Sequence, residues 1–247
     1  MKVIIIAAGS GSRLNKHSSD MPKTLTPIGE QTIIDIIIQT LKKVGIREIA
    51  LVCGFKKEML KAYLGDGSPH GVKLTYIFNP QWENPNGISV WTAKDFVKKY
   101  EPFLLLMSDH IFDIKIADLM VQAPLAEAQL LLAVDANPER VFDIDDAMKV
   151  QFIEKRGRKL ITAIGKKLPE YNGIDCGLFK CDSEIFRALE ASFAMRKYAL
   201  ADGCRETIKK ESFFAIDIGD AFWIDIDTPE SLAYAQKQIL ENKELKR

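Results

Sequence analysis

The sequence contains little histidine, no paired cysteine motif and no excess of either charge. Its three histidines and four cysteines include no Cys-x-x-Cys pair, which argues against a structural zinc site. Lysine plus arginine and aspartate plus glutamate number 34 each, so zero net charge gives no general attraction for nucleic acid. Any recognition of phosphate groups must therefore come from a local site.

Long hydrophobic runs are absent too. The apolar segment at residues 32–41 carries Asp35 and is too short to cross a bilayer. The first residues, MKVIIIAAG, lack the cleavage site of a signal peptide. We therefore expect a cytoplasmic protein with no membrane and no nucleic-acid partner. The content of 47% hydrophobic and 28% charged residues suits one α/β domain over residues 1–247.

Apolar periodicity predicts alternating strands and helices in the first half of the chain. We expect strands at residues 2–7, 48–54, 72–78 and 102–109. We expect helices at residues 31–44, 56–64 and 87–98. In the first of these, one face carries Ile34, Ile37, Ile38 and Leu41, and Gly45 ends the helix. This βαβ order predicts a parallel sheet with right-handed crossovers.

The second half is less regular. Residues 147–165 predict a hairpin that turns around Arg156-Gly157-Arg158. Further strands are expected at residues 174–181 and 221–226, and helices at residues 183–193 and 229–241. Thr228 and Pro229 provide a helix cap and a first-turn proline for the last helix.

A glycine-rich segment, AAGSGSRLNKHSSDMPKTL at residues 7–25, follows the first predicted strand. A dinucleotide fingerprint needs a third glycine where Leu14 stands, and an acid after the second strand, where the sequence reads ALVCGF. The Walker A pattern is absent. Glycines here bring backbone N–H groups close to a phosphate chain, while Arg13 and Lys23 supply positive charge. The segment therefore favours another kind of phosphate site.

This segment resembles the signature of nucleotidyltransferases that couple a nucleoside triphosphate to a sugar phosphate or alcohol phosphate. The resemblance implies an α/β fold that is Rossmann-like and GT-A-like: a three-layer sandwich with a mostly parallel mixed sheet and a small appended hairpin region. It assigns Arg13 and Lys23 to catalysis, on the triphosphate. It assigns nucleotide binding to the residues around the glycines, Ala7, Ala8, Gly9, Ser10 and Gly11.

Nucleotidyl transfer needs a divalent cation, and Mg²⁺ prefers one or two carboxylates plus substrate phosphates. Asp109 ends a buried strand, where ligands of open α/β sheets gather. Asp225 and Asp227 lie on one side of WIDIDTPESL. The resemblance assigns the metal to Asp109 and Asp225. It leaves Asp227 open, and capping of the last helix is the alternative.

Later strings resemble the inositol-phosphate cytidylyltransferases. They are NPNGISVWTAKDFV, LLMSDHIFD, RVFDIDDAMKV and IGKKLPEYNGIDCGLFKCDSEIF. The chain departs from that pattern at Ser108, which replaces glycine, and at Asp146, which replaces glutamate. The likeness implies that Asn86 and Gly87 face cytosine, that Lys166 contacts the acceptor phosphate as a catalytic residue, and that Asp143 and Asp175 bind polyol hydroxyls. Packing roles are expected for Trp82 and Trp91, and a structural role for His110.

The resemblance therefore implies Mg²⁺-dependent transfer of a cytidylyl group from CTP to a phosphate-monoester acceptor, inositol 1-phosphate. Phosphocholine, 2-aminoethylphosphonate or another sugar 1-phosphate are the alternative acceptors. A catalytically inactive relative would lack Arg13, Lys23 or the aspartates, all of which are present. A homodimer is compatible with this prediction.

Overall fold

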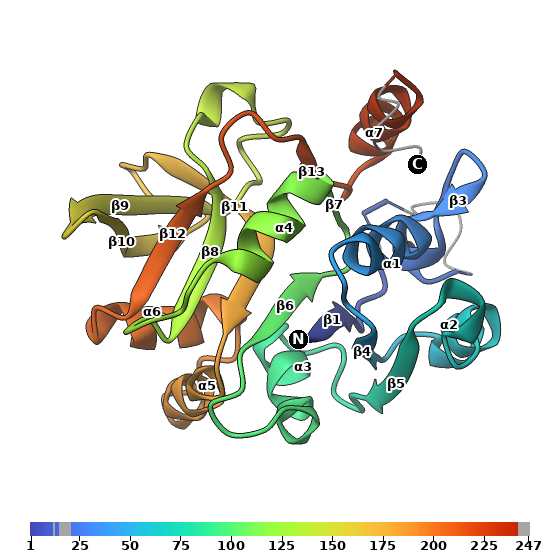
Figure 1. The fold of residues 1–247 in the computed structure, drawn as a ribbon, viewed down its shortest axis with the longest axis horizontal. Helices are drawn as coiled ribbons and strands as arrows, with labels where there is room; N and C mark the ends of the chain where they lie inside the picture. Colours follow the sequence, from blue (N-terminus) through green and yellow to red (C-terminus); the bar gives the residue numbers. More distant parts are fainter. Residues whose placement is uncertain (12, 15–20, 242–247) are drawn as a thin grey trace.

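A computed structural model describes residues 1–11, 13–14 and 21–241. Its centre is a mixed β-sheet with helices on both faces (Figure 1). The strands of this sheet, in chain order, are β1 (Lys2–Ala7), β4 (Glu48–Cys53), β5 (Lys73–Phe78), β6 (Phe103–Met107), β8 (Leu130–Asp135), β9 (Lys149–Lys155), β10 (Arg158–Gly165), β11 (Gly173–Cys181) and β12 (Phe213–Asp217). Two small ribbons are formed by β2 (Pro27–Ile28) with β3 (Gln31–Thr32) and by β7 (His110–Phe112) with β13 (Trp223–Asp225).

The helices are α1 (Ile33–Lys43), α2 (Lys57–Leu64), α3 (Gly87–Thr92), α4 (Ile114–Gln122), α5 (Glu184–Ala194), α6 (Leu200–Lys209) and α7 (Pro229–Glu241). Among the described residues, none of these helices has the length and apolar character that crossing a membrane requires.

The sheet order is β5-β4-β1-β6-β11-β8-β12-β10-β9. Strands β5, β4, β1 and β6 are parallel, as the βαβ pattern predicts, and β11 enters antiparallel between β6 and β8. The predicted hairpin is β9 and β10, which turn at Arg156 and Gly157. It is joined to the sheet, because β10 pairs with β12 and β9 pairs with β11. This part of the sheet thereby curls back on itself.

Two hydrophobic cores lie on opposite faces of the sheet. In β1, Val3 and Ile5 pack into one core, while Ile4 and Ile6 pack into the other. This alternation follows from the two-residue repeat of a strand. The first core is covered by α1, α2, α4 and α7, and the second by α3, α5 and α6. A strand buried on both faces must be apolar throughout, which explains why β1 reads KVIIIA.

The helix predicted at residues 31–44 is α1. Thr32 caps its N-terminus by accepting a hydrogen bond from the backbone N–H of Asp35, whose carboxylate accepts from the N–H of Thr32. Gly45, at φ +84°, ends it in the left-handed conformation that favours glycine. The predicted face, with Ile34, Ile37, Ile38 and Leu41, lies in the first core.

The structure differs from the predicted elements in two ways. The helix expected at residues 87–98 ends as α3 at Thr92, and a separate 3₁₀ turn covers Lys94–Phe96. The elements α4, β8, α6 and β12 lie in segments for which the sequence predicted no element. Gly203 weakens the helical pattern in the sequence of α6. A Cβ at this position would lie 2.7 Å from a methyl group of Leu189, so glycine allows the close packing of the two helices. Packing against α5 therefore stabilises a helix with a weak local preference.

Candidate active site

Two neighbouring cavities open at the carboxyl end of β1 and β6. The glycine-loop cavity, of about 280 Å³, is lined by residues that include Ala8, Gly9, Gly11, Lys23 and Asn86. The β11-side cavity, of about 230 Å³, is lined by residues that include Asp143, Asp146, Lys166 and Asp175. Arg13, Asn86, Met107, Asp109 and Asp227 line both cavities. Ligands that occupy the two cavities would meet at these side chains.

Lys23 is buried below the glycine loop, with 7% of its surface exposed. Gly11 has φ +64°, and a Cβ on it would lie 2.4 Å from the Cβ of Lys23. Glycine is therefore required for the loop to pass over the lysine. The Lys23 ammonium donates to Asp109 Oδ2 at 2.8 Å and to Asp227 Oδ1. Burial lowers the pKa of Lys23, but the nearby carboxylates raise it more, so this lysine keeps its charge.

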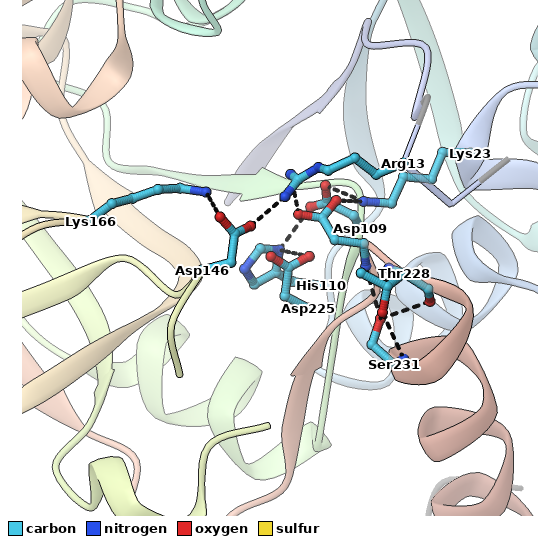
Figure 2. A network of polar contacts seen from close by, with 10 residues as sticks. Arg13, Lys23, Asp109, His110, Asp146, Lys166, Asp225, Thr228 and Ser231 are labelled. Atoms are coloured by element: carbon cyan, nitrogen blue, oxygen red, sulfur yellow. Dashed lines mark hydrogen bonds and ion pairs between the residues drawn. The ribbon is translucent and has the colours of Figure 1, made fainter. Parts of the chain in front are cut away.

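An alternating series of charges runs from one cavity to the other (Figure 2). The Nζ of Lys166 lies 2.7 Å from a carboxylate oxygen of Asp146, whose other oxygen accepts from Arg13. The second terminal nitrogen of Arg13 donates to Asp227, which also accepts from Lys23. We call this series, Lys166–Asp146–Arg13–Asp227–Lys23–Asp109, the ion chain.

The outer part of the ion chain is exposed to solvent. The side chains of Arg13, Asp146 and Lys166 are 54%, 38% and 47% exposed. Ion pairs this exposed contribute only about 0–1 kcal/mol. A phosphate group that enters can therefore replace the Asp146 carboxylate at these two cations with little loss of stability.

Asp109, His110 and Asp225 form a group that could hold a metal ion. One ligand atom from each lies within 4.8 Å of the others. Antiparallel pairing of β7 with β13 places His110 opposite Asp225. Asp225 Oδ1 is buried without a hydrogen-bond partner among the described residues. An orphaned carboxylate oxygen beside a second carboxylate fits a hard divalent cation.

Neighbouring side chains hold His110 in place. Its Nδ1 lies 2.8 Å from Asp109 Oδ1, and its ring stacks on Trp223 at 5.9 Å between centroids. The Trp223 indole donates to the buried carboxylate of Asp135 at 2.9 Å. On Gly177, at φ +73°, a Cβ would lie 2.4 Å from the His110 ring. The imidazole therefore has no room to shift toward β11.

Burial and charge separate the pKa values of these groups. Burial raises the pKa of Asp109, but Lys23 and His110 outweigh it and hold that pKa well below its usual range. Burial, with repulsion from Asp109 and Asp227, raises the pKa of Asp225 to about 7. Burial lowers the pKa of His110, yet Asp225 and Asp109 raise it to about 9. Perturbed groups that share a cavity are typical of a functional site.

Comparison with known proteins assigns the family. The family model for nucleotidyl transferases matches residues 2–242. This chain belongs to that family. It is therefore a nucleotidyltransferase.

Several relatives are similar along nearly the whole of this nucleotidyltransferase. A bifunctional IPC transferase and DIPP synthase of Aquifex aeolicus is 30% identical over 96% of the chain and 51% of the relative. The chain thus spans about half the length of that relative. A low-salt glycan biosynthesis nucleotidyltransferase of Haloferax volcanii is 30% identical over the whole chain and 68% of the relative.

Solved structures share the fold. The inositol-1-phosphate CTP transferase from T. maritima has a TM-score of 0.84 at 22% identity, covering 100% of this chain and 96% of that one. A putative glucose-1-phosphate thymidylyltransferase from Bacillus anthracis has a TM-score of 0.81 at 22% identity, covering 100% and 99%. The Rossmann-like nucleotidyltransferase fold predicted from the sequence is confirmed.

The nucleotidyltransferase brings most of the predicted site residues together. Around the cavities lie Ala8, Gly9, Gly11, Arg13, Lys23, Asn86, Asp109, Asp143, Lys166, Asp175 and Asp225. Ala7, Ser10 and Gly87 are not among the described residues that line either cavity. A Cβ on Gly87 would lie 2.5 Å from the Tyr198 carbonyl oxygen, so its glycine serves the packing of α3 against the start of α6. Asn86 accepts from Leu200 N at 2.9 Å in the same contact.

Three residues of the candidate site were not assigned to it from the sequence. Asp146 was noted only as a replacement for glutamate, and the role of Asp227 was left open. His110 was expected to be structural, yet it belongs to the candidate metal group. Their positions in the sequence could have indicated them, since each lies within three residues of a residue that the sequence analysis assigned to the site. Their partners come from distant segments, which the sequence does not reveal.

Trp82 and Trp91 differ in their surroundings. Trp91 packs edge-on against Phe193, in keeping with the packing role expected of it, and its indole donates to Glu190. Trp82 packs against Phe55 and also lines the glycine-loop cavity. Residues 15–20 of the glycine-rich signature lie outside the described residues.

Proposed function

We propose that this nucleotidyltransferase transfers a cytidylyl group from CTP to inositol 1-phosphate, with Mg²⁺, to give CDP-inositol and pyrophosphate. The observation that carries the proposal is the ion chain. Its three cations face two adjoining cavities, which matches a reaction between two phosphate-bearing substrates. The names of the Aquifex and T. maritima proteins support the choice of base and acceptor.

CTP is assigned to the glycine-loop cavity. Backbone N–H groups near Gly9 and Gly11 suit a triphosphate, and Arg13 offers two nitrogens that now contact carboxylates. Lys23 is buried and charged, so it can stabilise negative charge that develops at the α-phosphate. Removal of one such electrostatic donor typically lowers turnover by about 100- to 1,000-fold.

The acceptor is assigned to the β11-side cavity. Lys166 would bind its phosphate, and Asp143 and Asp175 would accept hydrogen bonds from hydroxyl groups. A phosphate-monoester oxygen attacks the α-phosphorus in line, a new P–O bond forms, and the bond to pyrophosphate breaks. The acceptor is already a nucleophile, so the protein contributes position and charge neutralisation.

Asp109 and Asp225 would hold the Mg²⁺. The orphaned oxygen of Asp225 and the ionised carboxylate of Asp109 fit the oxygen ligands that this ion prefers. When bound, the ion supplies positive charge against the phosphate oxygens. His110 orients Asp109 through its hydrogen bond. Cytoplasmic location and a homodimer stay predictions from the sequence.

One observation favours a second acceptor class. The β11-side cavity gathers the carboxylates of Asp143, Asp146, Asp175 and Asp225 beside the ring of Trp223. Acids with an aromatic face can bind an alkylammonium group, as in phosphocholine or 2-aminoethylphosphonate. One ring face of Trp223 is already covered by His110, so an aromatic cage would be incomplete.

The test is pyrophosphate release with Mg²⁺ and CTP against four acceptors: inositol 1-phosphate, phosphocholine, 2-aminoethylphosphonate and glucose 1-phosphate. Release with inositol 1-phosphate supports the proposal, and UTP and GTP in place of CTP check the base. Pyrophosphate release with a cationic acceptor alone would mean that Asp143 and Asp175 bind the ammonium group of the acceptor and not polyol hydroxyls. Release with glucose 1-phosphate alone would reject both acceptor classes.

A further inference from the structure

One wall of the β11-side cavity is a segment without regular structure. Residues 141–148, between β8 and β9, consist of turns and bends. We call this segment the acceptor loop. It contributes to the cavity lining at Phe142, Asp143, Asp146, Ala147 and Met148. A segment without a ladder of main-chain hydrogen bonds needs other contacts to keep one shape.

Lys149 follows the acceptor loop and is fixed in the sheet. It is the first residue of β9, where it lies opposite Gly165 of β10 and Ile174 of β11. Only 8% of its surface is exposed. Lysine is seldom buried to this degree unless its ammonium group is fully hydrogen-bonded.

The buried ammonium group of Lys149 points back at the loop. Its Nζ donates to the main-chain carbonyls of Ile144 at 2.7 Å, Asp145 at 3.2 Å and Ala147 at 3.3 Å. An ammonium has three N–H donors, and loop carbonyls accept from all three. The Tyr171 ring lies 5.7 Å away. Among the described residues no carboxylate forms an ion pair with Lys149, so the contact serves the loop backbone.

We propose that Lys149 is a positioning residue for the acceptor, which fixes the acceptor loop from beneath and so sets the shape of the acceptor cavity. The loop contains strained backbone, since Asp143 has φ +55°. It also carries Asp146, which joins Arg13 to Lys166. The identity of the acceptor rests on the proposed function, whereas the role of Lys149 in the loop does not.

The two cavities predict a selective effect. Among the described residues that line the glycine-loop cavity, none comes from the acceptor loop. Loss of the Lys149 contacts should therefore weaken acceptor binding and leave the binding of CTP unchanged. A general loss of stability would alter both.

The test compares Lys149→Met with Lys155→Met. Both substitutions remove an ammonium group from β9, but Lys155 lies at the far end and pairs with Glu211 on the surface. For Lys149→Met we expect the acceptor KM to rise about tenfold, equivalent to about 1.4 kcal/mol, with the KM for CTP within about twofold of wild type. For Lys155→Met we expect both constants to match wild type.

Hydrogen exchange of the free protein gives an independent measurement. Amides of residues 141–148 should lose protection in Lys149→Met, while those of β10 and β11 keep theirs. Unchanged protection of the loop would overturn the proposal, and so would equal increases in both KM values. If wild type does not use inositol 1-phosphate, the proposed function has failed and hydrogen exchange alone decides the role of Lys149. Should Lys149→Met not fold, Lys149→Gln, which keeps two N–H donors, takes its place, and we expect changes in the same direction but smaller.

Discussion

Individual carboxylates in this site have different tasks because their surroundings differ. Asp109 is held ionised by Lys23 and His110, whereas Asp225 carries a buried oxygen without a hydrogen-bond partner among the described residues, 3.9 Å from His110 Nδ1. Both carboxylates are disfavoured by burial, and both are arranged for a cation. Residues placed in this way contribute to function more than to stability.

Substitution of the metal candidates should separate activity from stability. We expect Asp109→Asn and Asp225→Asn each to lower kcat by about 100- to 1,000-fold, because charge stabilisation near the phosphates is lost. The melting temperature of Asp225→Asn should change little, since the raised pKa of Asp225 shows that folding disfavours its ionised form, while His110 keeps its contact with Asp109. The matched control is Asp220→Asn, which changes an exposed carboxylate five residues earlier. Steady-state kinetics with scanning calorimetry check this, and full activity in both variants would contradict the metal assignment.

Asp175 gives a prediction about pH. Burial raises its pKa to about 6, although the amide of Gly177 opposes this. Because the folded pKa lies above the unfolded one, its contribution to stability is complete below about pH 4 and is lost as the pH rises through 6. Asp175→Asn should therefore gain stability relative to wild type between pH 4 and 7.

Chemical denaturation of metal-free protein at pH 4.5 and pH 8 measures this difference. Asp143→Asn is the control, since it changes an exposed carboxylate of the same cavity. The change between the two pH values should be larger for Asp175→Asn than for this control. A pH-independent difference for Asp175→Asn would show that burial does not govern this group.

At the scale of elements, β11 determines where the metal candidates lie. It enters the sheet antiparallel next to β6, and Gly177 places its backbone against His110. The β7–β13 ribbon then sets Asp225 beside His110. The position of the group thus depends on close contact between one strand and one imidazole ring.

Two glycines with nearly equal φ angles test this contact. A Cβ added to Gly177, at φ +73°, would lie 2.4 Å from the His110 ring, whereas a Cβ added to Gly157, at φ +74° in the hairpin turn, would have nothing within 4 Å. Alanine at either position introduces backbone strain of about 1–2 kcal/mol. We expect both variants to lose a few degrees of melting temperature. Gly177→Ala alone should also lower kcat by about tenfold or more, through a displaced His110.

Activity assays beside thermal unfolding decide between these outcomes. Equal kcat in Gly177→Ala and Gly157→Ala would mean that His110 tolerates displacement. In that case the stacking on Trp223 would have no functional consequence.

At the scale of the whole molecule, a neutral chain concentrates charge where two segments meet. The net charge is zero, yet the ion chain gathers charged residues from the glycine-rich segment, the end of β6, the acceptor loop, the turn after β10 and the turn before α7. The glycine-loop cavity is lined mainly by the N-terminal part of the sheet, and the β11-side cavity is lined by both that part and the curled part. The junction of the two is therefore the place where the substrates would react.

This division predicts that the cations act on different substrates. Lys166→Gln should raise the acceptor KM about tenfold and leave the KM for CTP unchanged, because Lys166 lines only the β11-side cavity among the described cavity residues. Lys167→Gln is the control, since its neighbouring ammonium is exposed and lines neither cavity. Kinetics with each substrate varied in turn measure this. Equal effects of the two substitutions on the acceptor KM would show that Lys166 does not contact the acceptor.

The sequence by itself determined much of the architecture. Strands such as β1 and helices such as α1 follow from apolar periodicity, because side-chain burial repeats with the geometry of each element. The glycine loop and Asp109 could be predicted as site candidates because each follows directly after a strand, whereas the choice of Asp225 over Asp227 came from the family resemblance. These features depend on local sequence, which is why reading along the chain was sufficient.

Only the tertiary structure decided which charges meet. Arg13 reaches Asp146 across 133 positions, and Lys23 reaches Asp227 across 204. Such pairs depend on the strand order, with β11 inserted beside β6 and β9 returning to β11. The need for glycine at position 87 could not be predicted from the local sequence either. The backbone that leaves no room for a side chain there belongs to Tyr198 and Ala199, just before α6. Local periodicity predicts which segments form helices and strands. The partners of the charged side chains depend on contacts that form only when distant segments pack together.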